Sequence, residues 1–241
     1  MTPSQKPIRI LAIGAHPDDL EFGVGGVLLK EHAAGSKIAL VVTSKGESGS
    51  SGTPEQRVAE ARAAAAFVGA EDQLTFLDFG GDGRQIASPE NTTAIARIIR
   101  AFKPQIVLAP SLSANQHPDH AAVGAATRNA CRIARYGGFA DLTDLPAHAI
   151  GSLWFYSITP IADENLTGTI LVDVSDVFSN WVEMMNCHGS QTSCRSYIDL
   201  QTSRSRQLGL AAGCEYAIAL RPNDLPVVSN LHSLSHTARG F

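Results

Sequence analysis

The sequence predicts an α/β protein with a Rossmann-like, three-layer fold and a mostly parallel sheet. Three β-branched apolar runs carry this prediction: residues 8–14 (IRILAIG), 37–44 (KIALVVTS) and 104–110 (PQIVLAP). Such unbroken runs are typical of strands that are buried on both faces. Because helical patterns separate the runs, we expect right-handed crossovers, a parallel sheet and helices on both of its faces.

The helices and one weaker strand complete the first part of the chain. A strand is expected at 73–79 (QLTFLDF). Helices are expected from about Leu20 to Ala34, over 53–70 and 88–102, and from about Pro118 to Arg135. Thr53 stands before Pro54, which is a favourable start for the second helix because threonine caps and proline fits the first helical position.

The remaining residues read as a long loop followed by further elements of the same kind. The segment 136–150 is rich in Gly, Asp and Pro, which indicates a surface loop and a candidate lid. Strands are expected at 152–158, 169–175 and 215–220, and helices at 176–191 and about 196–212. No linker interrupts the pattern, so we expect one domain over 1–241, with its core in 1–135 and a loop and C-terminal extension in 136–241.

Composition excludes several classes of protein. Of the 241 residues, 44% are hydrophobic, which is enough for a substantial core, and the net charge is −4. Lysine and arginine are scattered, so no nucleic-acid partner is expected. No apolar run approaches the roughly 20 residues of a membrane span, and no signal peptide is evident. The four cysteines form no CxxC pair, which favours a reduced, cytoplasmic protein.

Two similar turns follow predicted strands about a hundred residues apart. The first is IGAHPDDLE, from Ile13 to Glu21, and the second is NQHPDHAA, from Asn115 to Ala122. Prolines at 17 and 118 could serve as first helical residues, with acids that favour the helix dipole. This helix-start interpretation requires neither histidine.

The two turns together supply the residue types of a metal site. If their strands are neighbours, three imidazoles and three carboxylates meet at the carboxyl edge of the sheet, where ligands bind in such folds. They belong to His16, Asp18, Asp19, His117, Asp119 and His120. A catalytic zinc ion takes three ligands of these types and keeps a fourth position for water. We therefore expect a metal site.

The motif AHPDDLE with a downstream HPDH resembles the PIG-L/LmbE-like deacetylases. The similarity runs from ILAIGAHPDDLEFGVGG through VVTSKGESGSSGTPEQRVAEARAAAAFVGA and LTFLDF to HPDHAAVG, and resumes at HGSQ, residues 188–191. Members of that family are zinc enzymes that remove an acetyl group from N-acetylglucosaminyl compounds. The resemblance implies a small N-acetylated sugar as substrate, and a homo-oligomer, a trimer or hexamer.

The resemblance also implies roles for the six residues. The metal ligands fall on His16, Asp19 and His120, holding Zn²⁺, with Fe²⁺ as an alternative because the donor set suits several divalent ions. Asp18 corresponds to the general base. His117 corresponds to the residue that steadies the oxyanion or protonates the leaving amine, and Asp119 to the acid that orients His117.

Two further residues are candidates for substrate binding, each with an alternative. Arg57 resembles a substrate-contacting arginine of the family, but it could also form a surface ion pair with Glu60 one helical turn away. His188, in CHGSQ, resembles a family segment near the pocket. It could equally cap a helix that ends at Gly189.

Two glycine-containing segments near the turns have structural interpretations. FGVGG, residues 22–26, lacks the dinucleotide-binding spacing and reads as a close-packing patch. SKGESGSSG, residues 44–52, reads as a mobile loop of the active site. A departure from the family pattern at Gln116 leaves the substrate open. The alternatives are a thiol-conjugate amidase that uses the same zinc site, and a non-catalytic Rossmann-like nucleotide-binding module.

Overall fold

A central sheet organises the protein in the computed structural model, which describes residues 7–113, 115–159, 168–231 and 235–237. Within these residues, seven strands pair in the order β3-β2-β1-β4-β5-β7-β6. They are β1 (Arg9–Gly14), β2 (Lys37–Val42), β3 (Leu74–Phe76), β4 (Ile106–Pro110), β5 (Ser152–Tyr156), β6 (Ile170–Asp173) and β7 (Ala217–Pro222). Only the pairings of β7 with β5 and β6 are antiparallel, so the predicted mostly parallel sheet is confirmed.

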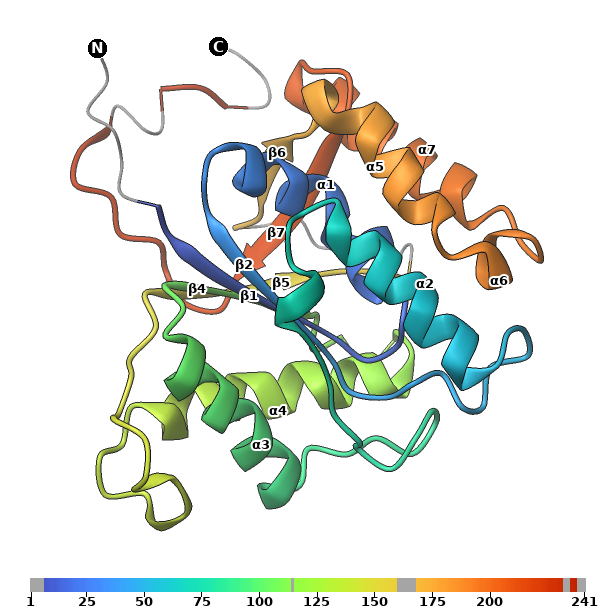
Figure 1. Ribbon diagram of the computed structural model, residues 1–241. Coiled ribbons are helices and arrows are strands. Elements are labelled where there is room, and N and C mark those ends of the chain that lie inside the picture. The colour runs from blue at the N-terminus through green and yellow to red at the C-terminus, as the bar shows by residue number, and fades with distance from the viewer. Residues whose placement is uncertain (1–6, 114, 160–167, 232–234, 238–241) are drawn as a thin grey trace.

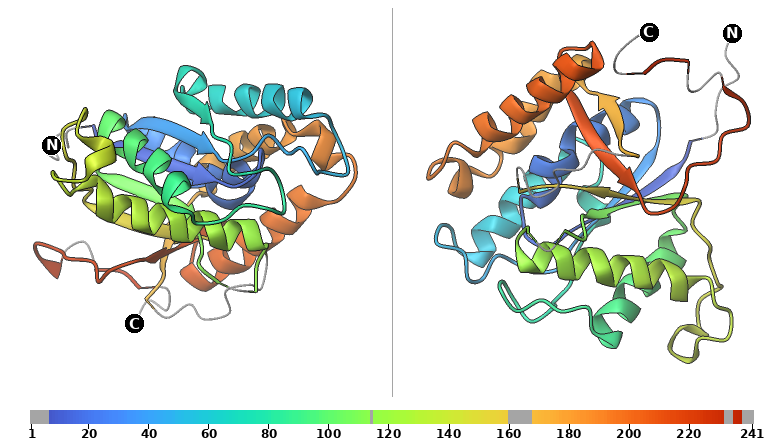
Figure 2. Two further views of the ribbon diagram at one scale, coloured as in Figure 1. Left: turned by 90° about the horizontal axis from the view of Figure 1, so that it is seen from below. Right: turned by 180° about the vertical axis from the view of Figure 1, so that it is seen from behind.

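Helices cover both faces of this sheet, as Figures 1 and 2 show. The helices are α1 (Asp19–Ala33), α2 (Pro54–Ala66), α3 (Pro89–Phe102), α4 (Pro118–Ala134), α5 (Phe178–Asn186), α6 (Gly189–Thr192) and α7 (Tyr197–Ala212). Single 3-10 turns lie at Glu71–Gln73, Ala140–Leu142 and Ser175–Val177. Helices α3 and α4 pack on one face, and α1, α2, α5 and α7 lie on the other (Figure 1). No described helix has the length and apolarity that crossing a membrane requires.

Alternation along the strands supplies both layers of the core. In β1, Ile10 and Ala12 join the cluster under α1, whereas Leu11 and Ile13 join the cluster under α3 and α4. The glycines of α1 permit its close approach to neighbouring elements. A Cβ on Gly23 would lie 2.5 Å from the ring of Tyr156, and one on Gly25 would lie 2.9 Å from Trp181. The close-packing interpretation of residues 22–26 therefore agrees with the structure.

The strand order places the two His-Pro-Asp turns side by side. Strands β1 and β4 are parallel neighbours in the middle of the sheet, and the chain proceeds from β1 to β2 and from β4 to β5 in opposite directions. This is a topological switch point, where open α/β sheets bind their ligands beyond the carboxyl ends of the strands. The turn after β1 carries His16, and the turn before α4 carries His117.

Several sequence-based boundaries need correction. Pro118 begins α4, but Pro17 does not begin α1, because the helix starts at Asp19 with Asp18 as its N-cap residue. The helix predicted over 176–191 is interrupted: α5 ends at Asn186, and a separate turn of helix, α6, begins at Gly189. Gly189 therefore starts a helix and does not end one.

The segment 136–150 is not a lid over the candidate site. It joins the end of α4 to the start of β5, at the amino ends of the parallel strands and away from the site (Figure 1). The buried side chain of Arg100 on α3 fixes it by donating hydrogen bonds to carbonyl oxygens, including those of Tyr136 and Leu145. The residues after 150 do not form a separate layer, because β5, β7 and β6 continue the same sheet.

Candidate metal centre

A cleft of about 550 Å³ opens at the carboxyl edge of β1 and β4. Its size lies within the range of small-molecule sites. The floor is formed by residues of the two His-Pro-Asp turns, and the walls by the loops after β2 and β3, the segment after β5, and helices α6 and α7. The lining residues used below are His16, Asp18, Asp19, Arg57, Asp82, His117, His120, Gln191, Arg195, Tyr197 and Gln201.

Three potential ligand atoms converge on the floor of the cleft. Nδ1 of His16 lies 3.3 Å from Nε2 of His120, which in turn lies 3.1 Å from Oδ1 of Asp19. In a tetrahedral zinc site with bonds of about 2.0–2.1 Å, ligand atoms lie about 3.3 Å apart. The other oxygen of Asp19 accepts hydrogen bonds from the backbone N–H groups of Ala15 and His16. The spacing and the fixed carboxylate fit a divalent metal ion.

The electrostatics of this cluster favour a cation. Burial lowers the pKa of His16, but Asp19, Asp119 and Asp82 together raise it to about 10. Burial also disfavours the charged form of Asp19, yet His120 and His16 hold the pKa of Asp19 well below its ordinary value. The cluster therefore holds a positive charge among carboxylates.

Asp119 supports the cluster from behind, in a way that the sequence did not indicate. Its Oδ2 accepts a hydrogen bond of 2.9 Å from Nε2 of His16 and one from the backbone N–H of Gly83. The expected partner, His117, has its Nδ1 3.8 Å from the same oxygen. Asp119 thus orients His16 through its carboxylate, and contacts His117 only through its backbone N–H, which donates to Nδ1 of His117.

His117 stands at the rim of the cluster. Its side chain is 45% exposed, and its ring centroid lies 4.9 Å from that of His16 and 5.2 Å from that of His120. Nδ1 accepts the hydrogen bond from Asp119, which leaves Nε2 for a ligand in the cleft. Burial and the neighbouring histidines lower the pKa of His117. His16, His117 and His120 also form a group close enough to hold a metal ion.

Asp18 occupies a strained position beside the cluster. Its φ of 121° lies in a region that favours glycine, and such strain is maintained only by surrounding contacts. Arg57 supplies these contacts, because its guanidinium donates to the carbonyl oxygen of Pro17 at 2.9 Å and to Oδ2 of Asp18 at 3.3 Å. Burial, and then the charge of Asp19, raise the pKa of Asp18 to about 7.

Arg57 is therefore a buried residue that holds the site together. It is 4% exposed, and the predicted alternative, a surface ion pair with Glu60, is wrong. Glu60 instead accepts hydrogen bonds from the backbone N–H and the hydroxyl of Ser190. These bonds tie α2 to the start of α6. Arg57 also reaches the carbonyl oxygen of Gly46, in the loop after β2.

Asp82 is a site residue that the sequence analysis missed. It lies in the GGDG loop after β3, where Gly80, Gly81 and Gly83 all have positive φ and turn the chain into the cleft. Its carboxylate accepts a hydrogen bond from Ser44 and lies 3.8 Å from both His16 and Arg57. The sequence signal that could have identified Asp82 was its position among three glycines, because glycine adopts positive φ without steric cost and therefore permits a sharp turn.

His188 lies beneath the cleft, in contrast to the expected substrate contact. It is completely buried and precedes α6, so the helix C-cap interpretation is also wrong. Its Nε2 lies 3.2 Å from a carboxylate oxygen of buried Glu21. Burial lowers the pKa of His188, but the charge and hydrogen bond of Glu21, together with the charges of Asp18 and Glu60, raise it above its ordinary value. His188 and Glu21 therefore form a second ionic contact beneath the cleft.

The remaining described histidines lie away from the cluster. His32 and His236 are exposed, and His148 is partly buried, with its Nε2 2.7 Å from the carbonyl oxygen of Pro104. His232 lies outside the described residues. None of the described three lines the cleft.

Comparisons with known proteins agree with this site. The sequence profile of the PIG-L family, described as GlcNAc-PI de-N-acetylase, matches residues 11–131, which include all six residues of the two turns. An uncharacterized deacetylase, YaiS, of Escherichia coli K12 is 35% identical over 136 residues, covering 55% of this chain and 72% of that protein.

Two further similarities extend over more of the chain. The diacetylchitobiose deacetylase of Thermococcus kodakarensis is 28% identical over 195 residues, covering 76% of this chain and 70% of that protein. Among solved structures, the conserved protein TT1542 of Thermus thermophilus superposes with a TM-score of 0.80 at 26% identity. That match covers 92% of this chain and 97% of the other.

Proposed function

This chain belongs to the PIG-L family of de-N-acetylases, and from that premise we propose that it is a zinc-dependent hydrolase of N-acetylated sugars. It would remove the acetyl group of an N-acetylglucosamine-type sugar or glycoconjugate and release acetate and a free amine. One observation carries the proposal: donor atoms of His16, Asp19 and His120 lie at ligand spacing on the floor of a cleft, with the carboxylate of Asp18 beside them.

The donor set supports a metal ion as cofactor. His16, Asp19 and His120 would hold it, and the hydrogen bond from His16 to Asp119 is the carboxylate–histidine pairing that steadies metal ligands in other proteins. When bound, such an ion polarises a carbonyl group and lowers the pKa of a water molecule. Two imidazoles and a carboxylate suit several divalent ions, so we propose zinc with iron as a physiological alternative.

We propose Asp18 as the general base. It lines the cleft next to Asp19, and a pKa of about 7 lets its carboxylate accept a proton from water at neutral pH. Arg57 holds the Asp18 turn in its strained conformation. The two adjacent carboxylates would thus have different roles, Asp19 as a metal ligand and Asp18 as the base.

We propose that His117 stabilises the oxygen of the amide as it reacts. Its Nε2 is left for the cleft, because Nδ1 accepts from the backbone of Asp119, so the Nε2–H of the neutral ring can donate a hydrogen bond to the oxygen of the tetrahedral intermediate. One such donor typically contributes about 3 kcal/mol to transition-state stabilisation.

The substrate assignment is supported by relatives whose names specify acetylated amino sugars, such as diacetylchitobiose deacetylase. The homo-oligomeric state, the cytoplasmic location and the single-domain organisation stay predictions. Gly23, Gly25 and Gly26 face buried side chains, so they do not form a phosphate-binding loop for the nucleotide-binding alternative. No specific observation favours the amidase alternative.

The test is the release of primary amine from N-acetylglucosamine, its chitobiose dimer and glucosaminyl-malate in N-acetylated form, with and without a chelator. We expect amine release that the chelator abolishes and added zinc restores. Metal-loaded protein that releases no amine from any of these sugars would contradict the proposed substrate class.

A further inference from the structure

The outer wall of the cleft contains a cationic side chain that the proposed reaction does not use. Arg195 lies between α6 and α7 and lines the cleft, and it is exposed. Its guanidinium carbon lies 6.0 Å from the centroid of the ring of Tyr197. No carboxylate among the described residues forms an ion pair with it.

The other charged groups of the cleft are already paired. Arg57 is 95% buried in its side chain and bound to Pro17 and Asp18. The carboxylates of Asp18, Asp19 and Asp82 all have cationic neighbours. Among the charged side chains that line the described part of the cleft, Arg195 is therefore the cation left to attract an anionic group.

Two fixed amides flank this cation. Nε2 of Gln201 donates to the carbonyl oxygen of Ile158, and Nε2 of Gln191 donates to that of Ser51. Both residues line the cleft, and the amide nitrogen of each is the atom used in these bonds. Gln201 is only 4% exposed, so its amide is held in place by its surroundings. Amide oxygens accept hydrogen bonds from hydroxyl groups of sugars and polyols.

An aromatic face completes the wall. Tyr197 packs against Phe22, with ring centroids 5.7 Å apart, and Leu200 beside it is 43% exposed. A rigid aromatic ring with a cation above it offers an apolar surface and a charge within one small area. The floor of the cleft contains no such combination.

We propose that Arg195, Tyr197, Gln191 and Gln201 form a second subsite that binds an anionic, hydroxyl-bearing group attached to the sugar, a carboxylate or a phosphate. This inference rests on the proposed deacetylase function and adds the chemical class of the aglycone. The acetamido group lies at the floor near Asp18 and His117, while the anion pairs with Arg195 at the mouth, so charge orients the substrate.

Three substrates with the same sugar test the subsite. They are methyl N-acetylglucosaminide, which is neutral, its carboxymethyl analogue, and N-acetylglucosamine 1-phosphate. We expect kcat/KM for at least one anionic substrate to exceed that for the neutral one by about fivefold or more at low ionic strength. Added salt should reduce this ratio because the guanidinium is exposed. The larger of the two ratios distinguishes carboxylate from phosphate.

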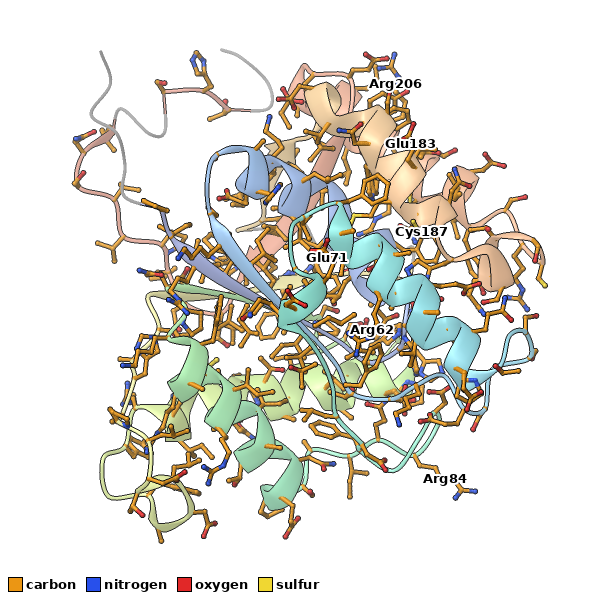
Figure 3. The ribbon with its side chains drawn as sticks, in the orientation of Figure 1. Arg62, Glu71, Arg84, Glu183, Cys187 and Arg206 are labelled. Carbon is orange, nitrogen blue, oxygen red and sulfur yellow. The ribbon has the colours of Figure 1, made fainter. Side chains whose placement is uncertain are left out.

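Variants test whether Arg195 causes the preference for anionic substrates. Arg195→Gln should reduce the ratio of anionic to neutral kcat/KM to about one, mainly through KM, and Arg195→Lys should retain part of it. Arg206→Gln is the matched control, because Arg206 lies towards the far end of α7 from α6 (Figure 3) and pairs with Glu215. That variant should leave the ratio unchanged.

The outcomes separate the two proposals. If the chelator-sensitive release of acetate from the neutral substrate equals or exceeds that from both anionic ones, the subsite is refuted and the deacetylase function stands. An anionic preference that survives Arg195→Gln also refutes it. Absence of chelator-sensitive release from all three substrates overturns the proposed function itself.

Discussion

Asp119 accepts a hydrogen bond of 2.9 Å from Nε2 of His16, so that Nδ1 of the same ring faces Asp19 and His120. One carboxylate therefore fixes both the tautomer and the direction of a proposed metal ligand. Asp119 itself is 1% exposed and is held by the backbone N–H groups of Gly83 and Gln85. The loop after β3 thereby supports the metal position without contributing a ligand to it.

Replacing Asp119 with asparagine should weaken metal binding. The amide keeps the size of the side chain but removes the charge that orients His16, and losses of such partners typically reduce metal affinity about 10- to 100-fold. Competition with a chromogenic chelator measures this. Asp72→Asn, at an exposed acid outside the cleft, is the control, and equal zinc affinity of the two variants would refute the role of Asp119.

Metal affinity should rise with pH. In the metal-free protein the carboxylates around His16 raise its pKa to about 10, above its value of about 6.5 in an unfolded chain. His16 is then protonated at neutral pH, and a metal ion must displace that proton. Below pH 10 we therefore expect affinity to increase about tenfold for each pH unit, with proton release that approaches one from this residue.

Calorimetry in two buffers of different ionisation enthalpy counts the protons released on metal binding. Asp19 contributes none in this range, because its pKa lies well below its ordinary value. An affinity for zinc that stays constant between pH 6 and pH 9, with no proton released, would show that His16 is neutral in the metal-free protein.

Replacing Asp18 with asparagine should abolish catalysis but not metal binding. Asparagine tolerates positive φ better than most residues, so the turn with its φ of 121° should persist. The amide cannot accept a proton, and we expect kcat to fall about 10²- to 10⁴-fold. Zinc content per protein chain, measured beside kcat, separates this effect from metal loss. A variant with near-normal kcat would exclude Asp18 as the base.

The sequence predicted which residues form the site better than it predicted the hydrogen bonds between them. The two His-Pro-Asp turns could be placed at one sheet edge because both follow buried strands, and the strand order confirms that these strands are neighbours. The partner of Asp119 could not be predicted, because the direction of its carboxylate depends on backbone N–H groups of a loop 36 residues earlier. Asp82 was missed because it lies in the same loop, which is distant in sequence from both His-Pro-Asp turns.

Local sequence patterns also gave wrong predictions at positions where burial determines the structure. The helix predicted over 176–191 followed its apolar spacing, but His188 is completely buried beside Glu21 and the chain breaks into α5 and α6 there. Arg57 read as a surface residue because its neighbours on α2 are polar. Its burial depends on Pro17 and Gly46, which lie far from it in the sequence.

Replacing Gly23 with alanine should destabilise the fold and the site together. The new Cβ would lie 2.5 Å from the ring of Tyr156, a buried side chain whose hydroxyl donates to the carbonyl oxygen of Ile13 at 2.7 Å. Overpacking of this kind costs about 1–3 kcal/mol. Ile13 ends the apolar part of β1 three residues before His16, so a shift of Tyr156 should also weaken zinc binding.

Urea unfolding measures the loss of stability, and chelator competition measures the loss of zinc affinity. Gly137→Ala is the matched control, because no atom lies within 4 Å of a Cβ placed there and the residue is exposed. Its free energy of unfolding should stay within about 0.5 kcal/mol of the parent. If Gly23→Ala matched this control in both measurements, α1 would have room to move away from β5, and the close approach would not be what positions the end of β1.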